Sequence, residues 1–402
     1  MELTRAAGAL LTPAGRAEPY PYYARLRDAP VLASDGWAVV SGYAECARAL
    51  RDPRLRAEDG EWLDQVAPDW RTNEAQVALE ASMLFANSPR HERVRRLVSR
   101  VFTPRRVADL RDSVERLAGD LTDHLAKLAA GGEPVDFMAE FAYPLPVTVI
   151  GALLGVPEAD WPGFRQDAAD FSMAFELAAT GEQLVAANAA TVRLQAYFAR
   201  LVAAKRAEPA ADLVSDLLRV HDEDPAALGA EELLANLVLL LFAGFETTTN
   251  LLGNGLRLLL DRPEHAARLR DDPGLAAAYV EEVLRYESPV QLTSRWNPDD
   301  LELGGVTVPA RSEVLILLAS ANRDPRRFVD PDVFHPDRPD NQPLSFGGGP
   351  HFCLGSALAR QEAQVAFPML LRRLTGLRLA GEPVRRDRMI LRGYQHLPVA
   401  VH

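Results

Sequence analysis

The stretch best suited to chemistry is Phe346–Gly355, in which one cysteine, Cys353, follows a glycine-rich turn. The residues after it, 354–364, have the pattern of a helix. Backbone N–H groups near the start of a helix favour an anion, so the sulfur is expected to lie where a thiolate is stabilised. Because the thiolate is the form of cysteine that binds metals, this stretch predicts a metal-binding cysteine.

Other kinds of site fit this stretch less well. A phosphate-binding loop would continue with Gly-Lys-Ser or Gly-Lys-Thr, and a dinucleotide-binding loop would show the GxGxxG spacing; the stretch has neither. A zinc site needs about four ligands, whereas the whole chain contains 2 cysteines. An isolated cysteine is most often a buried and inert core residue, so the surrounding pattern must carry the metal-binding interpretation.

A second feature interrupts the longest helical pattern, Glu231–Leu260. This segment is apolar on most sides in its first half, so it is expected to cross the interior. A glycine within a helix costs ~1 kcal/mol relative to alanine, so the Ala-Gly-Phe-Glu-Thr-Thr run in its middle indicates a functional constraint. The helical period places Leu239, Ala243 and Thr247 on one face with Gly244 beside them. These small residues would let a flat group approach the backbone.

Two pairs of charged residues also have helical spacing. His91 and Arg95 stand four apart in a basic helical segment, and Glu282 and Arg285 stand three apart in another. Each pair therefore shares one helix face. Taken alone, a basic run is usually a solvated face, and a Glu/Arg pair is usually a surface salt bridge of little energetic value.

The remaining pattern predicts a mainly helical chain with small antiparallel sheets. Hairpins are expected at 31–40 and 301–308, and short strands near 375–380 and 388–400. Residues 54–89 have a weak pattern and are interpreted either as a lid or binding loop or as a poorly ordered surface loop. No linker or internal repeat divides the sequence, so one domain, 1–402, is expected. Helices are predicted at 20–30, 43–50, 91–100, 107–128, 140–154, 160–180, 182–207, 211–220, 231–260 and 276–287, with a turn at 221–225.

Composition limits the classes of function. The formal net charge of −12 argues against general nucleic-acid binding. Cys46 and Cys353 lie far apart in sequence and do not suggest a disulfide framework, and Cys46 is interpreted as a core residue. The apolar run near the N-terminus is too short for a secretory signal or a membrane span. A cytoplasmic protein without a membrane anchor is therefore expected.

The motif Phe346-Gly347-x-Gly349-x-His351-x-Cys353-x-Gly355 resembles the haem-binding loop of the cytochromes P450, the haem-thiolate monooxygenases, and the whole chain is similar to their soluble bacterial type. The resemblance implies the cytochrome P450 fold, with haem b between the long central helix and the cysteine loop, and Cys353 as the axial ligand of the iron. The cofactor-binding residues that it implies are His91, Arg95, Ala243, Gly244, Arg295, Phe346, Gly347, His351, Cys353 and Gly355. Of these, His91, Arg95, Arg295 and His351 match the positions that contact the haem propionates. It also assigns Glu282, Arg285 and Arg338 to a structural trio.

The same resemblance implies the reaction and its partners. Glu246 and Thr247 match the acid–alcohol pair that handles protons beside dioxygen, so dioxygen is expected as co-substrate. Electrons are expected from NAD(P)H through a ferredoxin or flavodoxin and its reductase, with the enzyme itself a monomer. The arginines at 96, 100, 105, 106 and 360 are candidates for the docking face, although each alone is equally well an ordinary solvated side chain.

The expected activity is insertion of one oxygen atom into a lipophilic small molecule, by hydroxylation or epoxidation, during the tailoring of a secondary metabolite such as a polyketide or peptide. The alternative is the same haem chemistry leading to desaturation, ring formation or aryl coupling. More remote interpretations are a haem-thiolate sensor without turnover and a helical protein without cofactor. By analogy the substrate pocket is predicted to include Leu84, Phe85, Leu239, Ala243, Val290, Leu292 and Tyr394.

Overall fold

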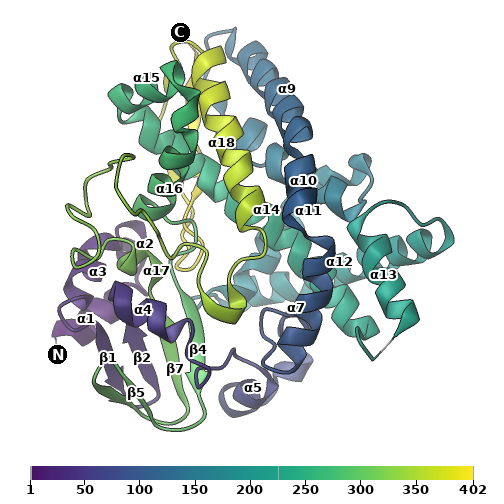
Figure 1. Cartoon of the computed structure of the whole chain (residues 1–402), viewed down its shortest axis with the longest axis vertical. Helices are drawn as coiled ribbons and strands as arrows, with labels where there is room; N and C mark the ends of the chain where they lie inside the picture. Colours follow the sequence, from purple (N-terminus) through teal and green to yellow (C-terminus); the bar gives the residue numbers. More distant parts are fainter. Residues whose placement is uncertain (1, 225, 402) are drawn as a thin grey trace.

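Helices make up most of the protein. The computed structural model describes residues 2–224 and 226–401. Figure 1 shows the N-terminal helices and the largest sheet together at the lower left, with the later helices stacked above and to the right. The α-helices are α1 Glu2–Ala9, α2 Pro13–Ala17, α3 Tyr20–Leu26, α4 Tyr43–Ala49, α5 Gly60–Val66, α6 Glu74–Ala81, α7 Arg90–Val101, α8 Pro104–Asp109, α9 Arg111–Ala129, α10 Pro144–Leu154, α11 Phe164–Phe171, α12 Gly181–Ala207, α13 Leu213–Glu223, α14 Ala230–Leu260, α15 Pro263–Asp271, α16 Ala276–Tyr286, α17 Leu318–Ala321 and α18 Ser356–Arg373.

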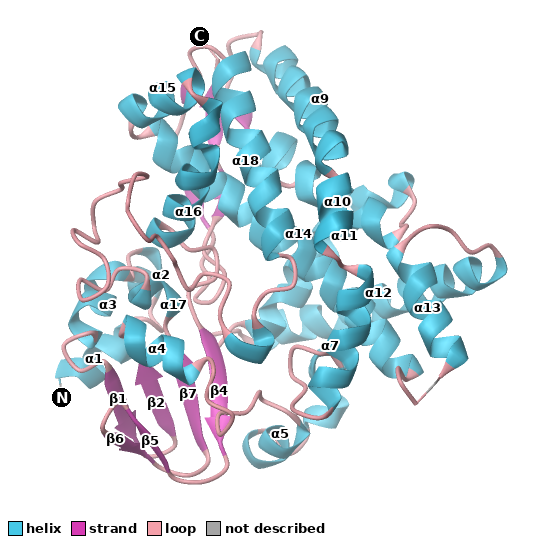
Figure 2. Ribbon diagram, viewed as in Figure 1, coloured by secondary structure: helices cyan, strands magenta, loops and turns pink. Residues whose placement is uncertain are grey.

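Strands occupy a small part of the chain and gather mainly in one corner (Figure 2). One sheet has the order β1-β2-β7-β4, and three smaller sheets pair β10 with β9, β5 with β6, and β3 and β8 with β11. The mainly helical fold with small sheets is therefore confirmed. The strands are β1 Val31–Ser34, β2 Trp37–Val40, β3 Val135–Asp136, β4 Thr293–Asn297, β5 Leu301–Leu303, β6 Val306–Val308, β7 Ser312–Ile316, β8 Arg378–Leu379, β9 Val384–Arg385, β10 Tyr394–His396 and β11 Pro398–Ala400.

The prediction that all sheets are antiparallel is wrong at one pair. β2 and β7 are parallel, with Trp37 opposite Glu313 and Val40 opposite Ile316. The chain passes through most of the helical part between these two strands. A local sequence pattern can therefore show that each strand exists, but it cannot show in which direction the two run relative to each other.

The longest predicted helix is present as α14 and crosses the interior. Its first turn is capped because the Glu232 carboxylate accepts the N–H of Gly229 at 3.0 Å. α18 packs against it, and α10 and α12 pack on other sides. Among the described residues α14 is the one helix long and apolar enough to cross a membrane, but 72% of its apolar window is buried inside the protein. Such burial is typical of a helix in the core of a globular protein.

Several predicted boundaries are corrected by the structure. Residues 54–89 are not irregular throughout, because Asp59 caps α5 and Asn73 caps α6 with their side chains. The predicted helix 107–128 is divided into α8 and α9 at Leu110, and the predicted helix 160–180 contains the 3₁₀-helices Glu158–Gly163 and Ser172–Phe175 on either side of α11. The predicted turn 221–225 is helical as far as Glu223, and Pro225 lies outside the described residues. The sequence pattern did not predict α1, α2, α15, α17 or the second half of α18.

Candidate active site

The loop Phe346–Gly355 is a closed turn beneath the cavity. The N–H of Cys353 donates to the carbonyl oxygen of Phe346 at 3.0 Å, which joins the two ends of the glycine-rich stretch. Gly347 and Gly349 have φ values of +70° and +65°, which side chains rarely adopt, and a Cβ on Gly349 would lie 2.3 Å from the carbonyl oxygen of Leu50. The glycines are therefore required by the backbone of the turn itself.

Cys353 lies where this turn meets α18. Burial raises the pKa of its thiol, while the N–H of Gly355 and the charges of Arg95 and Arg360 act in the opposite direction. Phe346 lies beneath the guanidinium of Arg360, whose Cζ is 4.4 Å from the ring centroid. Arg360 also forms an ion pair with Glu281 at 2.5 Å, so it holds the aromatic ring in place rather than projecting freely to solvent.

One face of α14 lines the same cavity as Cys353. Leu239, Ala243 and Thr247 all line the cavity, as their helical spacing predicts. The Thr247 hydroxyl donates to the carbonyl oxygen of Ala243 at 3.1 Å, which leaves its oxygen lone pairs as acceptors. Gly244 also borders the cavity, but a Cβ there would lie 2.4 Å from Ile150 of α10. The absent side chain of Gly244 is thus required by helix packing, and its place on the cavity wall leaves the prediction that it lies beside a flat ligand standing.

Glu246 does not line the cavity. Its side chain is buried, and its carboxylate is hydrogen-bonded to Arg386 in the segment between β9 and β10. The ion pair joins residues that are 140 positions apart in the chain. No local pattern in the sequence points to Arg386, because the contact arises only when the C-terminal segment folds against α14.

Four basic side chains from three distant segments meet at one edge of the cavity; we call His91, Arg95, Arg295 and His351 the cavity cluster. All four line the cavity, and the His91 and His351 rings are 4.0 Å apart between centroids. Burial and the neighbouring arginines lower the pKa of His91, and they lower that of His351 to about 2. The arginine pKa values are lowered as well, chiefly by burial.

Within the described part of the chain, the cavity cluster lacks a full set of acidic partners. Arg95 donates to the carbonyl oxygen of Phe352 at 2.6 Å, and Arg295 donates to that of Ser294 at 2.6 Å. Among the described residues neither arginine forms an ion pair, although Glu58 is close enough to act electrostatically on Arg295. Buried cations are normally paired. This donor set, next to a cavity lined with apolar residues and one cysteine, therefore fits a flat apolar ligand that carries carboxylates, as haem does.

The predicted trio of Glu282, Arg285 and Arg338 is brought together by the structure. Arg285 binds Glu282 through two hydrogen bonds of 2.7 and 2.8 Å, and both side chains are fully buried. Arg338 lies 3.4 Å from the same carboxylate. Arg285 also donates to the carbonyl oxygens of Asn322, Pro331 and Val333. These contacts fix the residues 322–341 that precede the cysteine loop.

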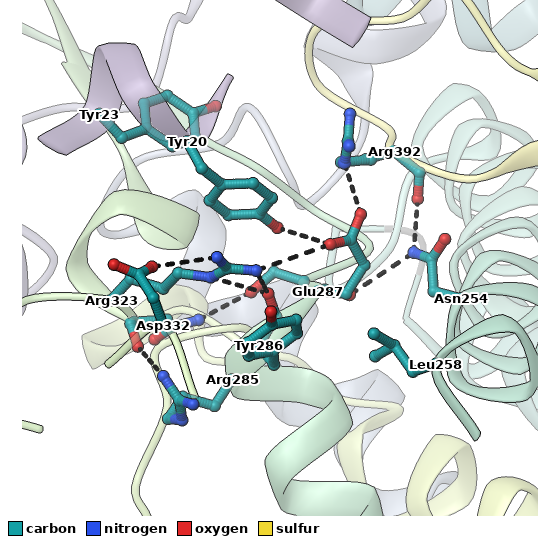
Figure 3. Close-up of polar contacts among 12 residues, drawn as sticks. Tyr20, Tyr23, Asn254, Leu258, Arg285, Tyr286, Glu287, Arg323, Asp332 and Arg392 are labelled. Atoms are coloured by element: carbon teal, nitrogen blue, oxygen red, sulfur yellow. Dashed lines mark hydrogen bonds and ion pairs between the residues drawn. The ribbon is translucent and has the colours of Figure 1, made fainter. Parts of the chain in front are cut away.

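A second buried basic cluster surrounds the carboxylate that ends α16; we call Glu287, Arg323, Arg385 and Arg392 the Glu287 cluster. Glu287 lies 2.6 Å from Arg392, 3.2 Å from Arg385 and 3.8 Å from Arg323, and it accepts the Tyr20 hydroxyl at 3.1 Å. Figure 3 shows Arg323 between Tyr20 and Tyr286, with Asn254 of α14 reaching the Arg392 carbonyl. The three arginine charges lower the pKa of Glu287 to about 2, against the effect of burial.

The predicted substrate-pocket residues divide into two groups. Leu84, Leu239, Ala243 and Val290 line the cavity, whereas Phe85, Leu292 and Tyr394 are not among its lining residues. Leu292 packs in a separate core with Tyr23 and Leu26, and the Tyr394 ring lies under Arg385 at 4.4 Å. Residues lining the cavity that sequence reasoning missed include Met83, Ile150, Leu240, Thr248, Leu251 and Thr293.

Known proteins resemble this chain over nearly its full length. The family model described as "Cytochrome P450" matches residues 177–273 and 274–387. Cytochrome P450 monooxygenase PikC of Streptomyces venezuelae is 42% identical over 95% of this chain and 91% of the relative. The 6-deoxyerythronolide B hydroxylase of Saccharopolyspora erythraea is 37% identical over 94% of this chain and 95% of the relative.

A solved structure supports the same relationship at the level of the fold. The crystal structure of P450BioI in complex with an acyl carrier protein ligated to hexadec-9Z-enoic acid superposes with a TM-score of 0.89 at 35% identity, covering 97% of this chain and 99% of that chain. Both sequence and fold therefore agree with the resemblance carried by the cysteine loop. This chain belongs to the cytochrome P450 family, whose members are oxygen-incorporating oxidoreductases that use a haem iron bound by a cysteine thiolate.

Proposed function

We propose that this protein is a monooxygenase that inserts one atom of dioxygen into a lipophilic small molecule during the tailoring of a secondary metabolite. The observation that carries the proposal is that Cys353 and the Leu239–Thr247 face of α14 line one and the same largely apolar cavity. Relatives named as a monooxygenase and as a 6-deoxyerythronolide B hydroxylase support it. A polyketide or peptide fits this proposal as substrate.

Each part of the site has a proposed task in binding the cofactor. The Cys353 thiolate binds the haem iron, and the cavity cluster binds the two propionates through charge-assisted hydrogen bonds. Phe346, held by Arg360, excludes water from the sulfur. Haem bound through a thiolate supplies the activation of dioxygen. Ala243 leaves space on the α14 side, and Leu239 and Val290 provide apolar contacts to the substrate.

Proton handling is proposed for Glu246 and Thr247. The Thr247 oxygen is free to accept a hydrogen bond from the cavity side because its own proton is given to Ala243. Glu246, one residue away, is proposed to relay protons from solvent, but its carboxylate is engaged by Arg386. Transfer from Glu246 towards Thr247 thus requires the ion pair with Arg386 to loosen. Replacing Glu246 by Gln should slow product formation and increase the solvent isotope effect on turnover.

Electrons are proposed to come from NAD(P)H through a reductase and a ferredoxin or flavodoxin. The exposed residues Arg96, Arg100 and Arg105 form the proposed docking face on this acidic protein. Arg106 and Arg360 contribute less, because they form ion pairs with Asp216 and Glu281. Reversing the three exposed charges should slow reduction of the protein by its electron carrier, most strongly at low salt. If the variant and the wild type are reduced at equal rates at every salt concentration, this face is not the docking site. A monomer in the cytoplasm fits such exchange with a soluble carrier.

The reaction itself is tested with a ligand screen followed by isotope labelling. Lipophilic candidates that displace the water from the haem iron are found by the shift of the haem spin state. Turnover of those candidates under labelled dioxygen should place one labelled atom in the product. Oxidised product without label would refute oxygen insertion in favour of desaturation, ring formation or coupling, and binding without consumption of reduced nicotinamide would refute an enzymatic role.

A further inference from the structure

The N-terminal arm, which we define as residues 2–17 with helices α1 and α2, packs against a segment near the C-terminus. Leu10 of the arm lies in the same cluster of buried apolar residues as Met389. Arg392 donates to the carbonyl oxygens of the last two residues of α2, at 2.9 and 3.0 Å. Apolar packing and hydrogen bonds therefore both hold the arm on the C-terminal segment.

A third attachment of the arm is an ion pair between Arg16 and Asp387. The Arg16 guanidinium donates to both carboxylate oxygens, at 2.5 and 2.8 Å, and also to the carbonyl oxygen of Leu11. The Arg16 side chain is 10% exposed. The hydrogen bonds of this pair raise the pKa of Arg16 and lower that of Asp387. A two-bond pair whose arginine is largely buried holds its partner more firmly than an ordinary surface ion pair does.

Asp387 is the middle residue of a tight turn that also carries the partner of Glu246. The N–H of Arg388 donates to the carbonyl oxygen of Arg386 at 3.0 Å, and the N–H of Arg386 donates to that of Gly393 at 3.1 Å. The Arg386 side chain binds the Glu246 carboxylate. Because Arg386 and Asp387 are consecutive, the ion pair that fixes Asp387 on the arm also limits the movement of Arg386.

The charged side chains of this turn lie between Glu246 and solvent. The Glu246 side chain is 4% exposed and that of Arg386 is 20% exposed. We propose that Arg16 is a positioning residue for proton delivery. By holding Asp387 it keeps Arg386 on the Glu246 carboxylate, and so limits how fast this acid exchanges protons with solvent. The inference rests on the proposed function of Glu246.

The first arm of the test needs no substrate and no electron carrier. Backbone amide exchange of residues 386–388 is measured in the purified protein for wild type, Arg16→Gln and the matched control Arg268→Gln. Arg268 also forms a two-bond ion pair, with Asp337 at 2.5 and 2.7 Å, but it belongs to α15. Exchange in the turn should become roughly twofold to fivefold faster in Arg16→Gln only. Equal exchange in Arg16→Gln and the wild type would overturn the proposal.

The second arm measures proton uptake by the haem-loaded enzyme. NADPH, ferredoxin and its reductase supply electrons, and dioxygen is the only acceptor, so each electron that dioxygen accepts is matched by one proton from solvent. At saturating ferredoxin, Arg16→Gln should oxidise NADPH roughly twofold to fivefold faster than the wild type, because Arg386 leaves Glu246 more readily. The solvent isotope effect should become smaller, while the KM for ferredoxin stays unchanged. An unchanged isotope effect would overturn the role in proton delivery.

Two double variants distinguish positioning from a general loss of structure. Exchanging the charges, with Arg16→Asp and Asp387→Arg together, should restore the wild-type rate and isotope effect. In a Glu246→Gln background, Arg16→Gln should change the isotope effect no further, because the carboxylate through which Arg16 acts is absent. A further change there would overturn the route through Glu246. Failure of the wild type to bind haem or to oxidise NADPH would refute the proposed function, whereas the exchange arm would still decide whether Arg16 holds the turn.

Discussion

The two partly buried basic clusters of this protein differ in the source of their negative charge. In the Glu287 cluster three arginines surround a carboxylate that the chain itself supplies, and the pKa values of Arg323 and Arg392 are raised. In the cavity cluster burial lowers the pKa values of both arginines, because no ion pair within the described residues compensates it. We therefore interpret the cluster with its own carboxylate as a stabilising element of the fold, and we propose the cavity cluster as the binding site for an acidic ligand.

The largest loss of stability is expected when the Glu287 carboxylate is removed from the Glu287 cluster. Glu287→Gln removes the charge that faces the buried Arg323 and Arg392 and the partly exposed Arg385, and only Arg323 keeps another ion pair, with Asp332, so the free energy of unfolding should fall by roughly 3–5 kcal/mol. Urea unfolding of the haem-free chain measures it. Glu313→Gln is the matched control, because burial raises the pKa of Glu313 to about 7 and its neutral form costs little to replace. Equal effects of the two substitutions would contradict the comparison.

The contribution of the Glu287 carboxylate should also appear in the pH dependence of the unfolding free energy at acid pH. The pKa of Glu287 lies at about 2 in the folded protein, against its ordinary value of 4.5. A carboxyl group with a depressed pKa contributes stability that is present above the ordinary value and is lost as the pH falls towards the folded value. The wild type should therefore lose its advantage over Glu287→Gln, ~3 kcal/mol, between about pH 4.5 and pH 2. A difference independent of pH in this window would show that the group is not ionised in the fold.

A substitution in the cavity cluster should weaken haem binding while leaving the stability of the haem-free chain almost unchanged. Arg295→Met should change the unfolding free energy of the haem-free chain by less than about 1 kcal/mol, because an unpaired buried charge is removed. It should weaken haem binding by roughly tenfold to a hundredfold, since a charge-assisted hydrogen bond is lost. Haem transfer to an excess of a scavenging globin gives the rate. Arg392→Met, the control in the Glu287 cluster, should destabilise the haem-free chain itself.

The smallest expected effect is the loss of stability when the flat Arg323 side chain is replaced by one of equal charge but different shape. The Arg323 guanidinium lies 3.6 Å from the Tyr20 ring centroid and 3.9 Å from that of Tyr286. Arg323→Lys keeps the positive charge but loses the flat stacking group, so a destabilisation of about 1 kcal/mol is expected in chemical unfolding. A loss as large as that of Glu287→Gln would mean that stacking, rather than charge pairing, holds this cluster together.

The sequence allowed prediction of those parts of the site that depend on local spacing. The Phe346–Gly355 turn and the Leu239–Thr247 face lie within single elements, so a motif or a helical period suffices to find them. Val290 and Leu292 show where such reasoning ends. Their two-residue spacing would put both on one face of a strand, but β4 begins only at Thr293, and the two side chains enter different cores.

Contacts between residues that are far apart in the sequence could not be predicted in this way. Arg386 pairs with Glu246, and Glu176 binds the 389–391 backbone, in each case across more than a hundred positions of chain. The parallel pairing of β2 with β7 belongs to the same class. Each of these contacts depends on how distant segments pack together, and local sequence patterns do not predict such packing.

The central claim is that the cavity binds haem through the Cys353 thiolate, and the absorbance spectrum of the reduced carbon monoxide complex tests it most directly. The purified wild type and Cys46→Ala, which changes the buried core cysteine, should both show the thiolate signature. Cys353→Ala should lose it together with all monooxygenation. A colourless wild type, or a thiolate signature that persists in Cys353→Ala, would contradict this assignment.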